Sequence, residues 1–331
     1  MRVFPNGTGL LLGLSLTFLG AWKWPNGALW LNTFFSSSVS QFAVVLVFLI
    51  QGWNLNANRI PPLIKDYRNV VLVQGLIFLG PLIFVLFLHS NDLLPPAWKD
   101  GFIFLAVLPT TISSCVVYTS MSNGDSDFSL GHATLSNFLA LLWVPLACSI
   151  LIVTPNVGVL NEWYAAGKYI LPQLFMFVLL PCFVGWLGRK VFLGNEESRF
   201  DEHLKRITFG CILFLAYLSL SKSILLWGEV DFLNSIIFLF PFLIIFLLFQ
   251  LFLSWYGSII FSKSPRVRVA KFFCISQKSL AMGLPLAGLL FAGETELEIR
   301  IICPLILYHF LQLVVGAFFI SPIKSWVRRT C

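Results

Sequence analysis

Lys278 is the residue of this sequence whose type and position most strongly suggest chemistry. It stands in the polar segment 276–285 (SQKSLAMGLP), inside an apolar stretch, and it is the one residue among the 22 Lys and Arg that we place within a hydrophobic span. An isolated charge is costly in lipid, and such a residue usually marks a functional site. Lys278 is therefore the first candidate for a substrate-binding or ion-binding role.

A second polar segment with a proline, 108–115 (LPTTISSC), interrupts another apolar stretch. Proline removes a backbone donor and kinks a helix, and nearby hydroxyls and amides can satisfy the freed carbonyls. Corresponding interruptions in the two halves of a membrane protein are typical of a transport site. The alternative is a pair of kinks that serve packing only. The candidate site residues of the two segments are Thr110, Thr111, Ser113, Ser114, Cys115, Gln277, Lys278 and Ser279.

Polar residues of three further apolar stretches are candidates for the same site: Gln74, Ser129, Thr134 and His309. A lone histidine is also common as a hydrogen-bonded core residue, and Gln74 could simply bond Gln277 across the bundle. The basic residues Arg266, Arg268 and Lys271 are interpreted as determinants of orientation that could also attract anionic lipid headgroups.

Membrane-spanning helices are expected to position these residues. Of the 331 residues, 58% are hydrophobic and only 11% are charged, whereas soluble domains carry about 25% charge. Apolar runs of about 20 residues recur along the chain, and a backbone in lipid must satisfy its own hydrogen bonds, so we predict an all-α membrane protein. Ten spans are predicted, at residues 8–24, 38–54, 69–89, 101–121, 128–154, 166–189, 206–226, 232–257, 268–293 and 298–320. The first is retained as a span, because no clear cleavage site of a signal peptide follows it.

The distribution of basic residues predicts the orientation of the chain. With the N-terminus inside, most Lys and Arg residues fall in inner segments, and the outer loops hold single ones, Lys23, Lys99, Lys168, Lys222 and Arg300. We therefore expect a multi-pass protein of the plasma (inner) membrane with both termini cytoplasmic. The same asymmetry explains the net charge of +7 without a nucleic-acid partner.

The sequence offers little for catalysis or metal binding. Its seven cysteines are odd in number and contain no C-x-x-C pair, so neither a disulfide framework nor a zinc site is expected. We find no acidic residue and no histidine pair at ligand spacing within the spans, so the protein is not expected to be an enzyme or to hold a cofactor.

The ten spans divide into two halves at the break around residues 155–168. Each half, residues 1–160 and 161–331, would hold five spans. An odd number of spans per repeat places the second copy upside down, which is the inverted arrangement of many secondary transporters.

These segments resemble the bile acid:sodium symporter superfamily, in particular its divergent bacterial and eukaryotic branch that includes the seventh member of solute carrier family 10. The resemblance covers nearly the whole chain and rests on 108–114 (LPTTISS), 133–137 (ATLSN), 277–285 (QKSLAMGLP) and Gln74 before Pro81. It implies ten spans, with a core domain from spans 3–5 and 8–10 and a panel domain from spans 1, 2, 6 and 7. It also implies broken helices that cross in spans four and nine, and transport by alternating access.

The resemblance also implies a sodium site that is degenerate in this chain. By position the sequence keeps Ser114, Ser129, Gln74 and Gln277. The motif asparagine falls on Cys115 and the glutamate on Phe273, so the carboxylate of the ion site is missing. His309 matches a histidine that lines the substrate cavity in the symporters.

Lys278 could take over the electrostatic role of the bound sodium ion. Its ammonium has three donors, which serine hydroxyls, amide oxygens and helix C-terminal carbonyls can accept. It could also exchange a proton during transport or act as counter-charge for an anionic substrate. The alternative is a permanent lock between the two broken helices.

The sequence thus favours a secondary transporter of a small organic anion, with membrane lipids as its surroundings and Na⁺ or H⁺ as the ions that could be coupled. Lys278 in place of a cation argues against sodium coupling. Two alternatives remain open: a sodium-coupled symporter that uses the degenerate site, and a non-transporting membrane regulator of calcium homeostasis.

Overall fold

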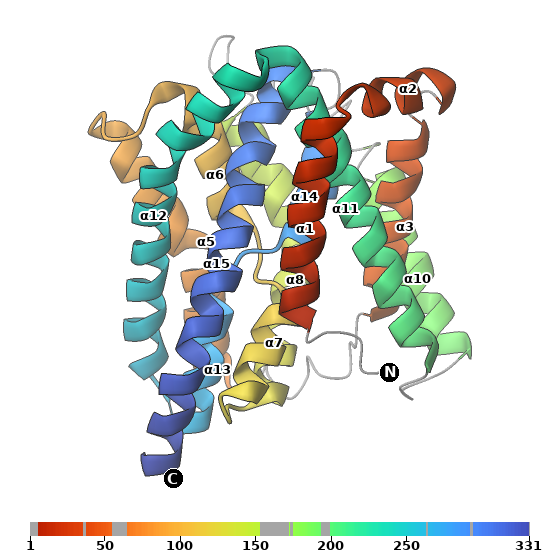
Figure 1. The fold of residues 1–331 in the computed structure, drawn as a ribbon. Helices are drawn as coiled ribbons and strands as arrows, with labels where there is room; N and C mark the ends of the chain where they lie inside the picture. The colour runs from red at the N-terminus through yellow and green to blue at the C-terminus, as the bar shows by residue number, and fades with distance from the viewer. Residues whose placement is uncertain are drawn as a thin grey trace.

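The computed structural model of the chain describes residues 6–35, 38–54, 65–152, 172, 175–192, 199–262, 264–291 and 294–330. Within these residues the regular structure is entirely helical (Figure 1). The elements are α1 (Asn6–Lys23), α2 (Asn26–Phe35), α3 (Ser38–Asn54), α5 (Tyr67–Ser90), η2 (Pro96–Trp98), α6 (Lys99–Val107), α7 (Ile112–Met121), α8 (Ser126–Leu151), η3 (Phe175–Leu179), α10 (Leu180–Phe192), α11 (Arg199–Trp227), α12 (Glu229–Ile259), α13 (Pro265–Ser276), α14 (Leu280–Leu290) and α15 (Thr295–Thr330).

Helices occupy each of the ten predicted ranges, in whole or in part. In the described part of the chain, seven helices are long and apolar enough to cross a membrane, and the bent pair α6–α7 gives an eighth candidate. These helices support a multi-pass membrane protein. The sequence did not predict the short helix α2, since residues 26–35 fall between the first two predicted spans. This helix lies across the end of the bundle between α1 and α3 (Figure 1).

Proline interrupts the fourth predicted span as the sequence indicates. Leu108, the residue before Pro109, is extended (φ −70°, ψ 149°), which is the conformation that a following proline favours. The chain stays non-helical to Thr111, and the two arms, Pro96–Val107 and Ile112–Met121, meet at 61°.

The ninth span is also broken, but the break is not caused by its proline as the sequence suggested. Pro285 lies inside α14 and does not cause the break, which falls at residues 277–279. Gln277 is extended (φ −113°, ψ 150°), and the Ser279 hydroxyl caps α14 by accepting from the Met282 N–H at 3.2 Å. Contacts to other helices, described below, replace the intrahelical hydrogen bonds that are lost here.

The broken helices form the interior of the molecule. All residues of α6 from Gly101 to Val107 are buried, and 83% of the most apolar part of α13–α14 is buried, against 28% for α12. The long α12 instead exposes large apolar side chains such as Ile237, Phe238 and Leu248, as a lipid-facing helix should.

Glycine allows one very close helix contact, between α3 and α10. A Cβ on Gly52 would stand 1.8 Å from the Cys182 carbonyl oxygen, and a Cβ on Gly185 would stand 1.9 Å from that of Leu49. Small residues at membrane helix interfaces let two backbones approach in this way.

The start of α1 and the end of α15 lie at the same end of the bundle, the lower one in Figure 1. This arrangement fits the prediction that both termini face one side of the membrane. The predicted boundary between the repeats, at residues 160–161, and Lys168 lie outside the described residues.

Candidate functional site

The two breaks meet in the interior of the protein. The Ser279 N–H, at the start of α14, donates to the Pro109 carbonyl at 2.8 Å, so the extended segments of the two interrupted helices are joined by a backbone hydrogen bond. The polar residues of both segments, far apart in sequence, are thereby gathered at one place.

Lys278 lies at this crossing with its side chain fully buried. Its Nζ donates to three backbone carbonyl oxygens, those of Ile77 at 2.6 Å, Ala106 at 2.7 Å and Leu108 at 2.9 Å. Three acceptors match the three donors of an ammonium group. Backbone carbonyls therefore surround the cation, whereas the serine hydroxyls that the sequence also suggested have other partners.

Each of these three carbonyls lacks its usual partner within a helix. The Ile77 carbonyl would accept from residue 81, but that residue is Pro81, which has no N–H. Those of Ala106 and Leu108 stand at the end of α6, where carbonyls are unpaired and carry the negative end of the helix dipole. The ammonium thus satisfies a set of acceptors that two local sequence features create.

Gln312 on α15 binds the backbone of Lys278. Gln312 Oε1 accepts from the Lys278 N–H at 2.7 Å, and Gln312 Nε2 donates to the Lys278 carbonyl at 2.7 Å. Gln312 Nε2 also lies 2.7 Å from His309 Nδ1, and this Nδ1 lies 3.3 Å from the Lys278 carbonyl oxygen. His309 therefore contacts Lys278 through its backbone. Gln312 was missed in the sequence, although it lies one helical turn after His309 on the same face.

The four residues of the predicted sodium site pair in separate groups. Ser114 donates a short hydrogen bond to Gln277 Oε1, and the Ser129 and Thr119 hydroxyls are 2.8 Å apart. Gln74 does not bond Gln277. Instead its Nε2 donates to the His132 carbonyl at 3.2 Å, while Gln74 Oε1 and Gln277 Nε2 are left without partners.

The remaining predicted residues lie around the same crossing. Thr110, Thr111 and Thr134 are buried, and the Thr110 carbonyl accepts from Asn137 Nδ2 at 2.8 Å. The Thr111 and Ser113 hydroxyls are 3.4 Å apart. The bond from Asn137 joins α8 to the first break, and the contact of Thr111 with Ser113 lies within the break and the start of α7.

Cys115 faces a second cysteine across the two broken helices. Its Sγ lies 3.3 Å from that of Cys274 on α13, next to Phe273, which packs against Tyr118. Thiols and an aromatic ring thus occupy the positions where the resemblance implies an asparagine and a glutamate. No group of three His, Cys, Asp or Glu residues that could hold a metal occurs among the described residues.

Two charged residues besides Lys278 are buried within the predicted spans, contrary to the sequence-based expectation. Lys278 is not the one buried lysine, because Lys271 on α13 is also fully buried and its Nζ donates to the Ile260 carbonyl at 2.6 Å. The spans are also not free of carboxylates: Glu298 in α15 is 7% exposed and lies 3.4 Å from Lys222 Nζ. The hydropathy pattern placed both residues at span ends, where a charge is ordinary, and packing buries them.

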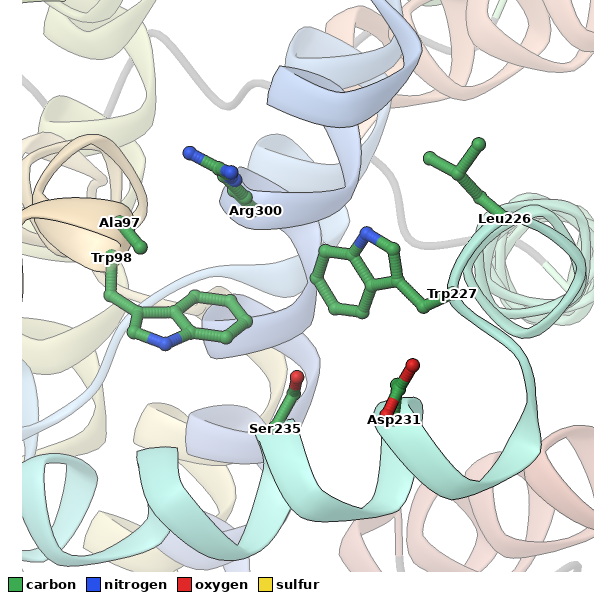
Figure 2. A pocket seen from close by; sticks show the side chains of 7 residues that line it. All are labelled: Ala97, Trp98, Leu226, Trp227, Asp231, Ser235 and Arg300. Atoms are coloured by element: carbon green, nitrogen blue, oxygen red, sulfur yellow. The ribbon is translucent and has the colours of Figure 1, made fainter.

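A pocket of about 390 Å³ opens at the upper end of the molecule in Figure 1, between the α11–α12 connection, η2 and α15. Its walls include the indoles of Trp98 and Trp227, whose ring centres are 5.8 Å apart, edge to face. Figure 2 shows Arg300 on one side of the two rings and Asp231 and Ser235 on the other. The pocket thus combines aromatic surface with the carboxylate of Asp231 and with Arg300, whose guanidinium is ion-paired with Glu296.

Known proteins are similar to this chain over most of its length. The protein YfeH of Escherichia coli (strain K12) is 27% identical over 291 residues, which are 86% of this chain and 83% of that protein. Sodium/bile acid cotransporter 7 of Xenopus tropicalis is 25% identical over 299 residues (88% of this chain, 83% of that protein), and its mouse counterpart is 24% identical over 300 residues (88% and 84%).

The resemblance seen in the broken-helix motifs is thereby confirmed. A model of the SBF-like CPA transporter family matches residues 8–325, nearly the whole length of the sequence. The chain belongs to the SBF-like CPA transporter family.

Proposed function

We propose that the protein is a secondary transporter of a small organic anion that works by alternating access, with Lys278 as a built-in cation. The observation that carries this proposal is the buried ammonium at the crossing, bonded to three carbonyl oxygens of α5 and α6. Family membership and relatives named as sodium/bile acid cotransporters support the class of function.

The geometry favours a particular role for this cation. Oxygen ligands are what a hard cation such as sodium would require, and here three carbonyls already surround a covalently attached positive charge. Because all three N–H donors are engaged, the ammonium has none left for a substrate in this conformation. It therefore neutralises the end of α6 and the free carbonyl of Ile77, and the substrate anion binds elsewhere.

The pocket lined by Arg300 is our candidate for the first contact with substrate. It lies where α11 meets α12, α15 and η2, the short helix that leads into α6. In the proposed division, with inverted repeats at residues 1–160 and 161–331, α11 belongs to the panel, and α12 and α15 belong to the core. An anion that approached between the two would compete with Glu296 for the guanidinium of Arg300 and would pack against two indoles.

One observation favours a second candidate, a sodium-coupled symporter with a degenerate site. Gln74 Oε1 is buried and has no partner in the described structure, so one amide oxygen of the predicted ion set remains free for a cation. The two candidates differ in whether sodium is consumed during transport.

Transport in liposomes tests the proposal and separates the two candidates. The full chain would be reconstituted, and uptake of labelled small organic anions, a bile acid among them, would be followed under an imposed sodium gradient, an imposed pH gradient or neither. The wild-type protein should take up an anion when no sodium is present. Lys278→Met should abolish this uptake, and the matched variant Lys324→Met, at the C-terminal end of α15, should retain it.

Three results would count against the proposal. Strictly sodium-driven uptake by the wild-type protein would favour the symporter with a degenerate site. Full activity of Lys278→Met would show that the built-in cation is dispensable. If no anion is taken up under any gradient, the transport function itself is wrong and the regulatory alternative gains.

A further inference from the structure

A second pocket lies at the opposite end of the molecule, where α15 ends. It has a volume of about 410 Å³ and is lined by Asn123, Gly124, Arg266, Val327 and Arg328. The turn between α7 and α8, the start of α13 and the end of α15 therefore meet around it (Figure 1). This is the end that the distribution of basic residues assigns to the cytoplasm.

Two arginines, Arg266 and Arg328, line this pocket, and neither is ion-paired within the part of the chain that the structure describes. The nearest acidic residue in sequence, Asp125, is engaged as the N-cap of α8, where its carboxylate accepts from the Phe128 N–H at 2.9 Å. Two exposed arginines thus line one surface pocket, and among the described residues no carboxylate is bound to either.

The backbone around the pocket is fixed by hydrogen bonds. Asn123 takes a left-handed conformation (φ 59°), and the next residue, Gly124, donates its N–H to the Thr119 carbonyl at 2.8 Å. The Asp125 N–H then donates to the Arg266 carbonyl at 3.0 Å, which joins the turn to the first turn of α13. The N-terminus of α13, capped by Ser264, adds the positive end of its dipole to the same region.

Arg268 on α13 contacts α12 and α15 next to the pocket. Its guanidinium carbon lies 5.1 Å from the ring centre of Trp255 on α12 and 5.1 Å from that of Trp326 on α15. Tryptophan is typical of the interface between lipid and water, and Trp255 is 49% exposed. The pocket therefore lies beside a surface that lipid headgroups can reach.

We propose that this pocket binds a phosphate group, and that the headgroup of an anionic membrane lipid supplies it. Guanidinium groups bind phosphate oxygens in bidentate fashion, and basic pockets on the cytoplasmic side of membrane proteins attract anionic headgroups. If Arg266 and Arg328 served only to orient the chain in the membrane, their charges alone would suffice and no pocket would be needed. The pocket that two unpaired arginines line on a hydrogen-bonded backbone is the additional feature that indicates a ligand.

The experiment compares two double variants that remove the same charge. Arg266→Gln with Arg328→Gln empties the pocket of guanidinium groups, and Lys324→Gln with Arg329→Gln removes two positive charges from α15 outside the pocket lining. The purified full chain and both variants would be incubated with phosphatidylglycerol, phosphatidylcholine or inorganic phosphate, and bound molecules would be counted by native mass spectrometry. Monodisperse elution would verify that each variant is folded.

The wild-type protein and the control variant should retain phosphatidylglycerol but not phosphatidylcholine. The pocket variant should lose at least about tenfold in affinity, as expected when charge-assisted hydrogen bonds are removed. Retention of inorganic phosphate with the same dependence on the two arginines would identify free phosphate as the source of the group. Equal losses in the two double variants, or no retention of either probe by the wild-type protein, would overturn the proposal. Neither result depends on whether the protein transports an anion.

Discussion

At the scale of single residues, the central feature is the match between one ammonium and three carbonyls that have no helical partner. Lys278 satisfies the Ile77 carbonyl, which Pro81 leaves free, and two carbonyls at the end of α6. Gln312 fixes the lysine backbone through both its N–H and its carbonyl. Charge, helix ends and a buried amide thus form one connected unit, and removal of any member leaves buried polar groups unsatisfied.

Lys278→Met should therefore destabilise the folded protein. The apolar side chain fills similar space but leaves three buried carbonyls without donors, and an unsatisfied buried group costs about 1–3 kcal/mol. Relief of the buried charge offsets part of this loss. We expect a net decrease of roughly 2–4 kcal/mol, visible as a lower midpoint of thermal unfolding in detergent. Lys324→Met is the control and should leave the midpoint nearly unchanged; an equal shift in both variants would contradict the role given to Lys278.

At the scale of helices, two kinds of interruption produce the crossing. Pro109 ends α6 through its own geometry, whereas the break between α13 and α14 contains no proline and depends on donors and acceptors from α6, α5 and α15. The second break is therefore a tertiary feature. Close contacts between unbroken helices, such as α3 with α10, set the surrounding framework.

Gly185→Ala tests the contact between α3 and α10. The added methyl would stand 1.9 Å from the Leu49 carbonyl oxygen, so the two helices must separate. Overpacking of this kind usually costs about 1–3 kcal/mol, and the unfolding midpoint should fall. Gly210→Ala on α11 is the matched control, because nothing lies within 4 Å of its added methyl; since alanine favours helix over glycine, this variant should be at least as stable as the wild-type protein. Unchanged stability of Gly185→Ala would show that the α3–α10 contact can relax.

At the scale of the whole molecule, the two ends differ in chemistry. The pocket in Figure 2 joins one arginine to two indoles and a carboxylate, while the pocket at the other end joins two arginines without a bound carboxylate. The buried crossing lies between them. This asymmetry fits a protein with a fixed orientation in a membrane that carries anionic lipid on one side.

The orientation predicts the location of the C-terminus. A green fluorescent protein fused after Cys331 should fluoresce, because it folds in the cytoplasm, and alkaline phosphatase fused at the same point should be inactive in a bacterial host. Fusions of both reporters after Asn91, in the α5–α6 connection at the opposite end, should give the reverse pattern. Active phosphatase at the C-terminus would refute the assigned orientation and would place the two-arginine pocket on the other side of the membrane.

The sequence by itself determined the class of the protein and the location of its polar interruptions. Apolar runs separated by charged loops require membrane helices, since a backbone in lipid has no other donors or acceptors. The isolated Lys278 and the segment around Pro109 could be recognised because a charge or a proline among apolar residues is costly unless the fold compensates for it.

Tertiary structure alone decided what these residues contact. The partners of Lys278 are backbone carbonyls, which every residue possesses, so side-chain types could not identify Ile77, Ala106 or Leu108. The burial of Lys271 and Glu298 depends on how helix ends pack, a property that hydropathy does not record. The polar residues at 276–279 indicated where the ninth span is interrupted. The cause of the break at residues 277–279 is visible only in the contacts that other helices supply.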